Sequence, residues 1–283
     1  MKKVLVTGGS GFIGSHILPE LSSKYTVIAP TRKQLDLKNR EAVLKYFDNT
    51  YFDAIVHLAS PSPLRSSDFD SFDTLIKDCI TLYMNLQSVS SHYGKLIYSG
   101  SGAEYDKTRD IVHISEDMIG ERIPADDYGL VKYVLNQLTR QSTNCYNLRI
   151  FGCYGPGEYD YKFIKHAINC VKNSETITIR QDCIFDYMYV ADYAKYIEYI
   201  IDNEPLYHDY NACAGIRIKL SEIAEIVKSI TGSSVPVEIS KDGLNKEYTG
   251  SNDRFMNESG GKVKLLSIED GIKKMIIEEG ISI

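Results

Sequence analysis

The segment that most constrains this fold lies at the start of the chain, where a short apolar run is followed at once by spaced glycines. Lys3–Thr7 predicts a buried strand and Phe12–Ser22 a helix. Between them, Gly8 permits a tight turn, Gly11 lets the backbone approach a pyrophosphate, and Gly14 allows close packing of the helix. A helix that begins directly after such a loop offers unpaired N–H groups to phosphates. This context predicts a dinucleotide-binding strand–loop–helix unit.

Strand-like and helix-like segments then alternate through the first half of the chain. The predicted strands cover residues 25–29, 54–59, 96–99 and 146–151, and the predicted helices cover residues 40–47, 72–92 and 127–141. Such alternation requires crossover connections, and therefore a parallel sheet with helices on both faces. We predict an α/β fold: a Rossmann-type doubly wound parallel sheet in residues 1–155, followed by a smaller C-terminal α/β substrate lobe in residues 156–283. Some segments of that lobe are expected to return to the Rossmann core.

Charge and cysteine usage exclude several classes of protein. The net charge is −6, and both signs are interspersed, which argues against a nucleic-acid-binding face. No apolar run reaches the roughly eighteen residues that a transmembrane helix needs, so we expect no membrane association and a cytoplasmic location. The six cysteines are scattered without a Cys-x-x-Cys pair, so we expect neither a disulfide framework nor a metal site.

The end of the second predicted strand bears on the choice of cofactor. An NAD enzyme usually carries an Asp or Glu there to accept the ribose hydroxyls, but this chain has none before Asp36. Thr31, Arg32 and Lys33 occupy the position instead, and the two cations could bind a 2′-phosphate through charge-assisted hydrogen bonds. This pattern favours NADP(H) over NAD(H), although the two cations could also be ordinary solvated loop residues.

A tyrosine and a lysine four residues apart supply a candidate acid/base pair. Tyr128 and Lys132 share one face of a predicted helix. A phenol, with a pKa near 10, exchanges protons poorly at neutral pH, and a neighbouring ammonium favours the phenolate. Such a phenol can protonate the alkoxide that develops when a hydride reaches a carbonyl. Ser99 and Ser101 close a predicted strand at the same sheet edge and could polarise that carbonyl oxygen.

Together these features resemble the extended short-chain dehydrogenase/reductase family, in particular its NAD-dependent epimerase/dehydratase group acting on nucleotide sugars. The resemblance covers most of the chain and includes Thr7–Gly14, Ser99–Tyr105, Tyr128–Lys132, Leu148–Gly157 and Asp186–Asp192. It implies Ser101, Tyr128 and Lys132 as catalytic residues and a nicotinamide dinucleotide as cofactor. The implied cofactor-binding residues are Gly8, Gly11, Phe12, Ile13, Gly14, Thr31, Arg32, Lys33, Asp36, Leu37, Leu58, Ala59, Ser60, Ser99, Tyr128 and Lys132.

Within that family the sequence favours one reaction. The 4,6-dehydratases carry Thr-Asp-Glu at the end of the catalytic strand, whereas this chain has Ser101-Gly102-Ala103. The end of the second strand resembles that of the NADP-using 4-keto-reductases. We therefore predict an NADPH-dependent reductase of a nucleotide-linked 4-keto(-6-deoxy) sugar. The alternatives are an NAD-dependent 4-epimerase and, from another class, a non-catalytic Rossmann-fold regulator that senses cofactor redox state.

One departure concerns the binding of the substrate's diphosphate. Relatives usually have an Arg where this chain has Phe185. Several other residues are candidate contacts for the nucleotide-sugar substrate, namely Ser62, Glu104, Lys162, Arg180 and Lys246. Family members are commonly homodimers joined by two helices of each subunit, which correspond here to residues 72–92 and 127–141.

Overall fold

The computed structural model describes residues 1–61 and 74–281, which form two compact units. The first unit comprises Met1–Asp106, Ile119–Ile150 and Tyr193–Tyr210, and the second comprises Lys107–Met118, Phe151–Asp192 and Asn211–Ile283. The predicted lobes met at residue 155, with some segments of the second expected to return to the first. In the structure Tyr193–Tyr210 belongs to the first unit, and Lys107–Met118 belongs to the second. Segments join a unit through contacts distant in sequence, which local periodicity does not reveal.

The first unit is built on a six-stranded sheet with the strand order β11-β6-β4-β3-β1-β2. The pairs β1/β2, β1/β3, β3/β4 and β4/β6 are all parallel. The strands are β1 (Lys3–Thr7), β2 (Thr26–Ile28), β3 (Phe52–His57), β4 (Tyr93–Ser101), β6 (Cys145–Ile150) and β11 (Asp209–Ala212). The predicted doubly wound α/β fold is therefore confirmed.

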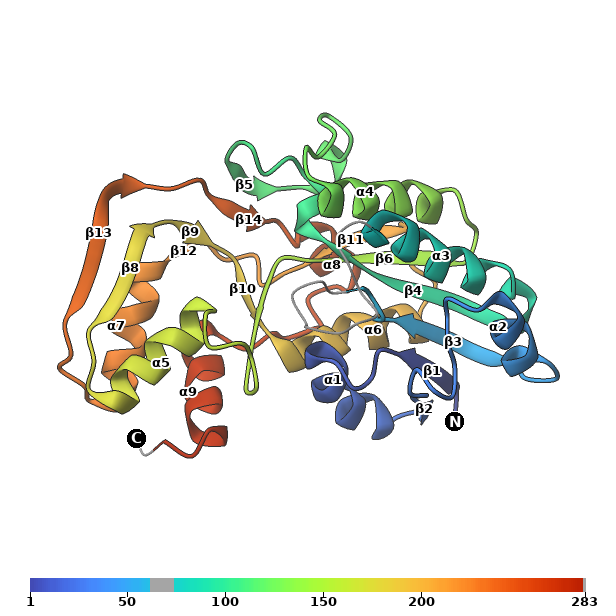
Figure 1. Cartoon of the computed structure of the whole chain (residues 1–283), viewed down its shortest axis with the longest axis horizontal. Coiled ribbons are helices and arrows are strands. Elements are labelled where there is room, and N and C mark those ends of the chain that lie inside the picture. Colours follow the sequence, from blue (N-terminus) through green and yellow to red (C-terminus); the bar gives the residue numbers. More distant parts are fainter. Residues whose placement is uncertain (62–73, 282–283) are drawn as a thin grey trace. The chain divides into compact units, whose positions relative to one another are not determined.

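Helices cover both faces of this sheet, with α2, α3 and α4 along one face and α1 and α6 along the other (Figure 1). Their bounds are α1 (Phe12–Ser22), α2 (Arg40–Phe47), α3 (Leu75–Gln87), α4 (Asp127–Arg140) and α6 (Tyr193–Asp202). The core beneath α2, α3 and α4 includes Leu5, Ile55 and Leu96 from neighbouring strands, all fully buried. Parallel strands buried on both faces read as continuous apolar runs, which explains why the sequence pattern located them.

The second unit combines small sheets with helices packed around their own core. A four-stranded sheet has the order β12-β9-β14-β5, and two further pairs are β10/β7 and β13/β8. The strands are β5 (Ile111–Ile114), β7 (Gly152–Tyr154), β8 (Ile177–Asp182), β9 (Ile184–Phe185), β10 (Tyr187–Tyr189), β12 (Ile218–Lys219), β13 (Val237–Leu244) and β14 (Tyr248–Gly250). The helices are α5 (Phe163–Asn173), α7 (Leu220–Thr231), α8 (Asp253–Glu258) and α9 (Ile268–Glu278).

Some predicted boundaries differ from the observed ones. For the helix predicted over residues 72–92, the first two positions lie outside the described residues. The structure has α3 over Leu75–Gln87, followed by a short 3-10 turn at Ser90–His92. The observed strand β4 extends beyond the predicted residues 96–99 and ends at Ser101. Across the described part of the chain, no helix combines the length and apolar character needed to cross a membrane.

Candidate active site

The glycine loop has the geometry that close approach of a ligand requires. Gly8 has a φ of +75°, and a Cβ there would lie 2.7 Å from the backbone nitrogen of Ala59. A Cβ at Gly14 would lie 2.4 Å from the Gly8 carbonyl oxygen. No side chain caps the N-terminus of α1, and its first turn holds no acidic residue. The amides of this turn, from Phe12 to Gly14, are therefore available to an anionic group such as a pyrophosphate.

The ends of β2 and β3 lie against this loop. A Cβ at Gly9 would lie 3.0 Å from the Cβ of Ala29, which directly follows β2. Leu58 and Ala59 follow β3 and border Gly8. Three of the predicted cofactor-binding segments therefore meet at one edge of the sheet, the edge where open α/β sheets bind dinucleotides.

The loop after β2 presents its polar residues to solvent. Thr31, Arg32 and Lys33 are exposed, and the Thr31 hydroxyl donates to the side chain of Gln34. Asp36 is partly buried and accepts the Lys38 amide at 3.0 Å. The structure thus places cations, and no carboxylate, directly after the β2 end.

Lys132 fastens α4 to the end of β4. Its Nζ donates to the Ser99 carbonyl oxygen at 2.9 Å, and the residue is only 4% exposed. One turn earlier, a Cβ at Gly129 would lie 2.4 Å from the Ala103 carbonyl oxygen, so only glycine allows this approach. Tyr128 is 38% exposed, and its ring centroid lies 5.8 Å from Lys132 Nζ. The candidate acid is thus accessible while its lysine partner is buried.

The two candidate serines differ in their bonding. Ser99 is buried, and its hydroxyl bonds the Tyr193 hydroxyl at 2.7 Å. Ser101 is partly exposed, and its Oγ accepts the Ala103 amide at 3.2 Å at the start of a 3-10 turn. The Ser101 hydroxyl can still donate its own hydrogen, which a carbonyl substrate requires.

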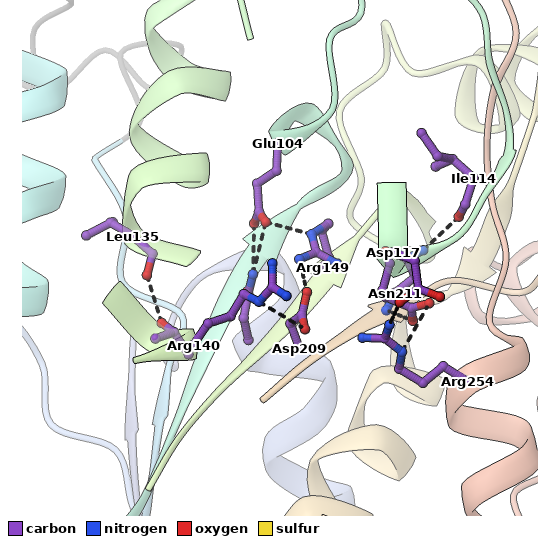
Figure 2. A network of polar contacts seen from close by, with 12 residues as sticks. Glu104, Ile114, Asp117, Leu135, Arg140, Arg149, Asp209, Asn211 and Arg254 are labelled. Atoms are coloured by element: carbon purple, nitrogen blue, oxygen red, sulfur yellow. Dashed lines mark hydrogen bonds and ion pairs between the residues drawn. The ribbon is translucent and has the colours of Figure 1, made fainter. Parts of the chain in front are cut away.

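Glu104, predicted as a substrate contact, instead belongs to a buried charge network. It is 0% exposed, so a substrate could reach its carboxylate only after a rearrangement. Arg149 donates from Nε to Glu104 at 2.6 Å and from Nη2 to Asp209 at 2.7 Å (Figure 2). Glu104 also accepts the Ser101 amide at 3.0 Å and the side-chain amide of Asn147. We therefore interpret Glu104 as a support for the Ser101 turn rather than a substrate contact.

The other candidate substrate contacts remain predictions. Ser62 lies outside the described residues. Lys162, Arg180 and Lys246 are exposed side chains of the second unit. At the position of the family's arginine, the Phe185 ring stacks on Tyr187 with centroids 5.5 Å apart.

Sequence reasoning missed three buried groups around the candidate catalytic pair. Tyr98 lies under Lys132, Tyr193 bonds Ser99, and His57 bonds the Thr7 hydroxyl at 2.8 Å. Tyr193 is 94 residues from its partner, so no local pattern could have revealed it. Burial, together with the Lys132 charge, lowers the pKa of His57 to about 3, so this imidazole is neutral at physiological pH.

Asp78 also has a structural role. It accepts from Lys38 at 2.6 Å and from the Thr74 hydroxyl at 2.9 Å. Because Lys38 follows the predicted cofactor residue Leu37, this ion pair ties the loop after β2 to the start of α3. Among the described residues, no group of three or more His, Cys, Asp or Glu side chains could hold a metal ion.

The buried carboxyl of Glu158 predicts a pH-dependent stability. Burial raises its pKa from 4.5 to about 8, with Lys162 opposing and Glu279 adding to the shift. The folded state keeps this proton up to about pH 8, whereas the unfolded state releases it near pH 4.5. The free energy of unfolding therefore decreases as the pH rises through this window. Glu158→Gln is expected to gain stability relative to wild type across that window, by at least ~1 kcal/mol. Melting temperatures measured across the window test this.

The exposed Glu238 offers a matched control for that experiment. Glu238→Gln should leave the pH dependence of the melting temperature unchanged. If Glu158→Gln and wild type show parallel melting curves from acid to alkaline pH, Glu158 does not carry the proposed proton.

The fold and this edge of the sheet define a class: NAD(P)-dependent enzymes of the extended short-chain dehydrogenase type. Residues 4–213 match the model of the NAD dependent epimerase/dehydratase family, so the chain belongs to that family.

Comparison with individual proteins gives more distant likenesses. The chain is 25% identical over 254 residues to a GDP-L-colitose synthase from Yersinia pseudotuberculosis, covering 81% of this chain and 82% of the relative. It is 24% identical to a UDP-glucose 4-epimerase from Halalkalibacterium halodurans, covering 94% and 92%. Among solved structures, a GDP-L-fucose synthetase from Naegleria fowleri bound to NADP superposes with a TM-score of 0.80 at 16% identity, covering 99% and 95%. The structural likeness concerns the fold alone.

Proposed function

We propose that this protein is an NADPH-dependent reductase of a nucleotide-linked 4-keto(-6-deoxy) sugar. The observation that carries the proposal is the attachment of the Tyr128–Lys132 helix to the end of β4, through the Lys132–Ser99 bond and the Gly129–Ala103 approach. This attachment packs the helix of Tyr128, the proposed proton donor, against the strand end that bears Ser101. The same strand end lacks the acidic residues of the dehydratases.

The proposed chemistry uses few protein groups. The nicotinamide cofactor, when bound, supplies the hydride. Ser101 donates a hydrogen bond to the substrate's carbonyl oxygen, and Tyr128 transfers its proton to that oxygen as negative charge develops. Lys132 stays charged beside the Tyr128 ring during this transfer. The glycine loop, with Gly8 and Gly14, leaves the space that a dinucleotide needs.

Arg32 is proposed to select NADPH over NADH. It lies exposed after β2, where a guanidinium can bind a 2′-phosphate through paired hydrogen bonds. Arg32→Ala is expected to raise the dissociation constant of NADPH about tenfold or more and that of NADH little. Fluorescence titration with both cofactors measures this, and Lys45→Ala, which removes an exposed cation of α2, is the control. Equal losses of affinity for NADPH and NADH would contradict the assignment of Arg32 to the 2′-phosphate.

An NAD-dependent 4-epimerase is the second candidate, favoured by the similarity to a UDP-glucose 4-epimerase. The two candidates differ in what becomes of the cofactor. A reductase consumes NADPH stoichiometrically when given a nucleotide-linked 4-keto sugar. An epimerase interconverts UDP-hexoses with no net change in a tightly bound NAD. A thermal-shift screen of cofactors, followed by assays with GDP-, CDP-, dTDP- and UDP-linked keto sugars, separates them, because ligands that bind only the folded state raise its melting temperature.

Exposed apolar side chains on α3 and α4 support the proposal that two copies pair through these helices. Met84 is 47% exposed, and Val134 and Leu138 are each 37% exposed. The two helices pack side by side, so their apolar residues belong to one helical pair. The molar mass in solution, compared with the chain's 31.9 kDa, tests this proposal.

A further inference from the structure

Lys132 is an ammonium buried without a carboxylate partner. It is 4% exposed, and within the described residues no acidic side chain lies at ion-pair distance from its Nζ. Its Nζ donates a hydrogen bond to the Ser99 carbonyl oxygen. Removing an ammonium from water is costly unless other groups replace its hydration. Something besides one carbonyl must therefore stabilise this charge.

The face of Tyr98 lies where such a group is needed. Lys132 Nζ is 4.7 Å from the centroid of the Tyr98 ring, closer than the 5.8 Å to the Tyr128 ring. Tyr98 is 3% exposed, and its hydroxyl has no hydrogen-bond partner among the described residues. Its ring is held by an edge contact with Tyr83 at 5.6 Å and by His57 at 5.9 Å. Ring packing therefore holds the Tyr98 side chain in place.

We propose that the ring face of Tyr98 keeps Lys132 charged and directed at Tyr128, which makes Tyr98 a positioning residue of the acid/base pair. The negative face of an aromatic ring stabilises a cation within about 6 Å while carrying no net charge. A carboxylate in the same place would stabilise Lys132 but cancel its field at the Tyr128 phenol. The ring therefore leaves the whole lysine charge to act on the proton donor. The catalytic meaning of this inference rests on the proposed function, whereas the effect on Lys132 does not.

Two other titratable groups around Lys132 offer it no counter-ion. They are Cys79 of α3 and His57 of β3. His57 is neutral and a thiol carries no negative charge when protonated, so neither offers a counter-ion. Burial disfavours the ammonium, whereas electrostatic interactions with the phenol groups of Tyr98 and Tyr128 favour it, so the pKa of Lys132 lies above its usual value.

The test compares Tyr98→Phe, which keeps the ring face, with Tyr98→Leu, which removes it. Carbon-13 NMR of labelled lysine Cε follows the titration of Lys132, whose signal is identified by its absence in Lys132→Arg. We expect Lys132 to stay protonated up to alkaline unfolding in wild type and in Tyr98→Phe. In Tyr98→Leu, Lys132 should lose its proton at a pH at least about one unit lower than in wild type.

Tyr93→Leu is the matched control, because Tyr93 lies on the same strand β4, is as buried as Tyr98, and is not among the groups that act on Lys132. It should lower thermal stability without moving the Lys132 titration. Should Tyr98→Leu fail to fold, progressively fluorinated phenylalanines at position 98 keep the ring's size while weakening its negative face. The pH at which Lys132 loses its proton should then fall stepwise with increasing fluorination.

The inference is overturned if Lys132 loses its proton at the same pH in Tyr98→Leu as in wild type. An unchanged pH across the fluorinated series would overturn it too. Failure of the proposed function gives a different result. In that case wild type would not consume NADPH with any nucleotide-linked 4-keto sugar, while the Lys132 titration would still respond to the ring at position 98.

Discussion

Tyr128→Phe is expected to lower turnover with NADPH and a nucleotide-linked 4-keto sugar on the order of a hundredfold or more. The substitution removes one oxygen atom, and with it the proton that neutralises the developing alkoxide. It leaves the α4 backbone and the Lys132–Ser99 bond intact. The dissociation constant of NADPH should therefore change little. Steady-state kinetics and a fluorescence titration on the same preparation measure both quantities.

Tyr133→Phe is a suitable control, since Tyr133 lies on the same helix and is only partly buried. Its turnover should equal that of wild type. Near-normal turnover in Tyr128→Phe would refute the role of Tyr128 as proton donor. A parallel loss of cofactor affinity would indicate instead that the phenol mainly holds the dinucleotide.

Arg149→Met is expected to reduce the free energy of unfolding by about 3–5 kcal/mol. Arg149 is 0% exposed and bonds Glu104 and Asp209 on either side (Figure 2). Methionine fills much of the volume but leaves two buried carboxylates without their cation. Denaturant unfolding measures the loss. Because Glu104 accepts the Ser101 amide, activity should also fall at temperatures where the variant is still folded.

Arg140→Met provides the contrast within the same network. Arg140 is 44% exposed and lies 3.9 Å from Asp209, so its loss should cost no more than about 1 kcal/mol. Adding Glu104→Gln to Arg149→Met removes one of the stranded charges and should recover part of the lost stability. If Arg149→Met is no less stable than Arg140→Met, the buried network does not hold this part of the fold.

Sequence reasoning found the features whose causes are local. The glycine loop could be recognised because a tight turn between a strand and a helix needs glycine at fixed positions, and Gly8 indeed has a positive φ. The parallel sheet could be recognised because strands buried on both faces are apolar throughout. Tyr128 and Lys132 could be paired because residues four apart share a helix face. Their catalytic roles rest on family resemblance and stay predictions.

Other features depend on contacts between distant parts of the chain. Glu104 is a predicted substrate contact, yet its partner Arg149 is 45 residues away and holds it in the interior. The route of the chain between the two units was likewise invisible to periodicity, because residues 107–118 and 193–210 carry no local sign of the unit they join.

By itself, then, the sequence determined the sheet, the phosphate loop and the spacing of the acid/base pair, since each follows from backbone geometry within a few residues. Only the tertiary structure decided what surrounds that pair: a carbonyl 33 residues away and the face of Tyr98 beneath the ammonium. The reason is physical. A buried charge is stabilised by whatever groups the fold brings around it, and those groups come from strands and helices that are neighbours in space and not in sequence.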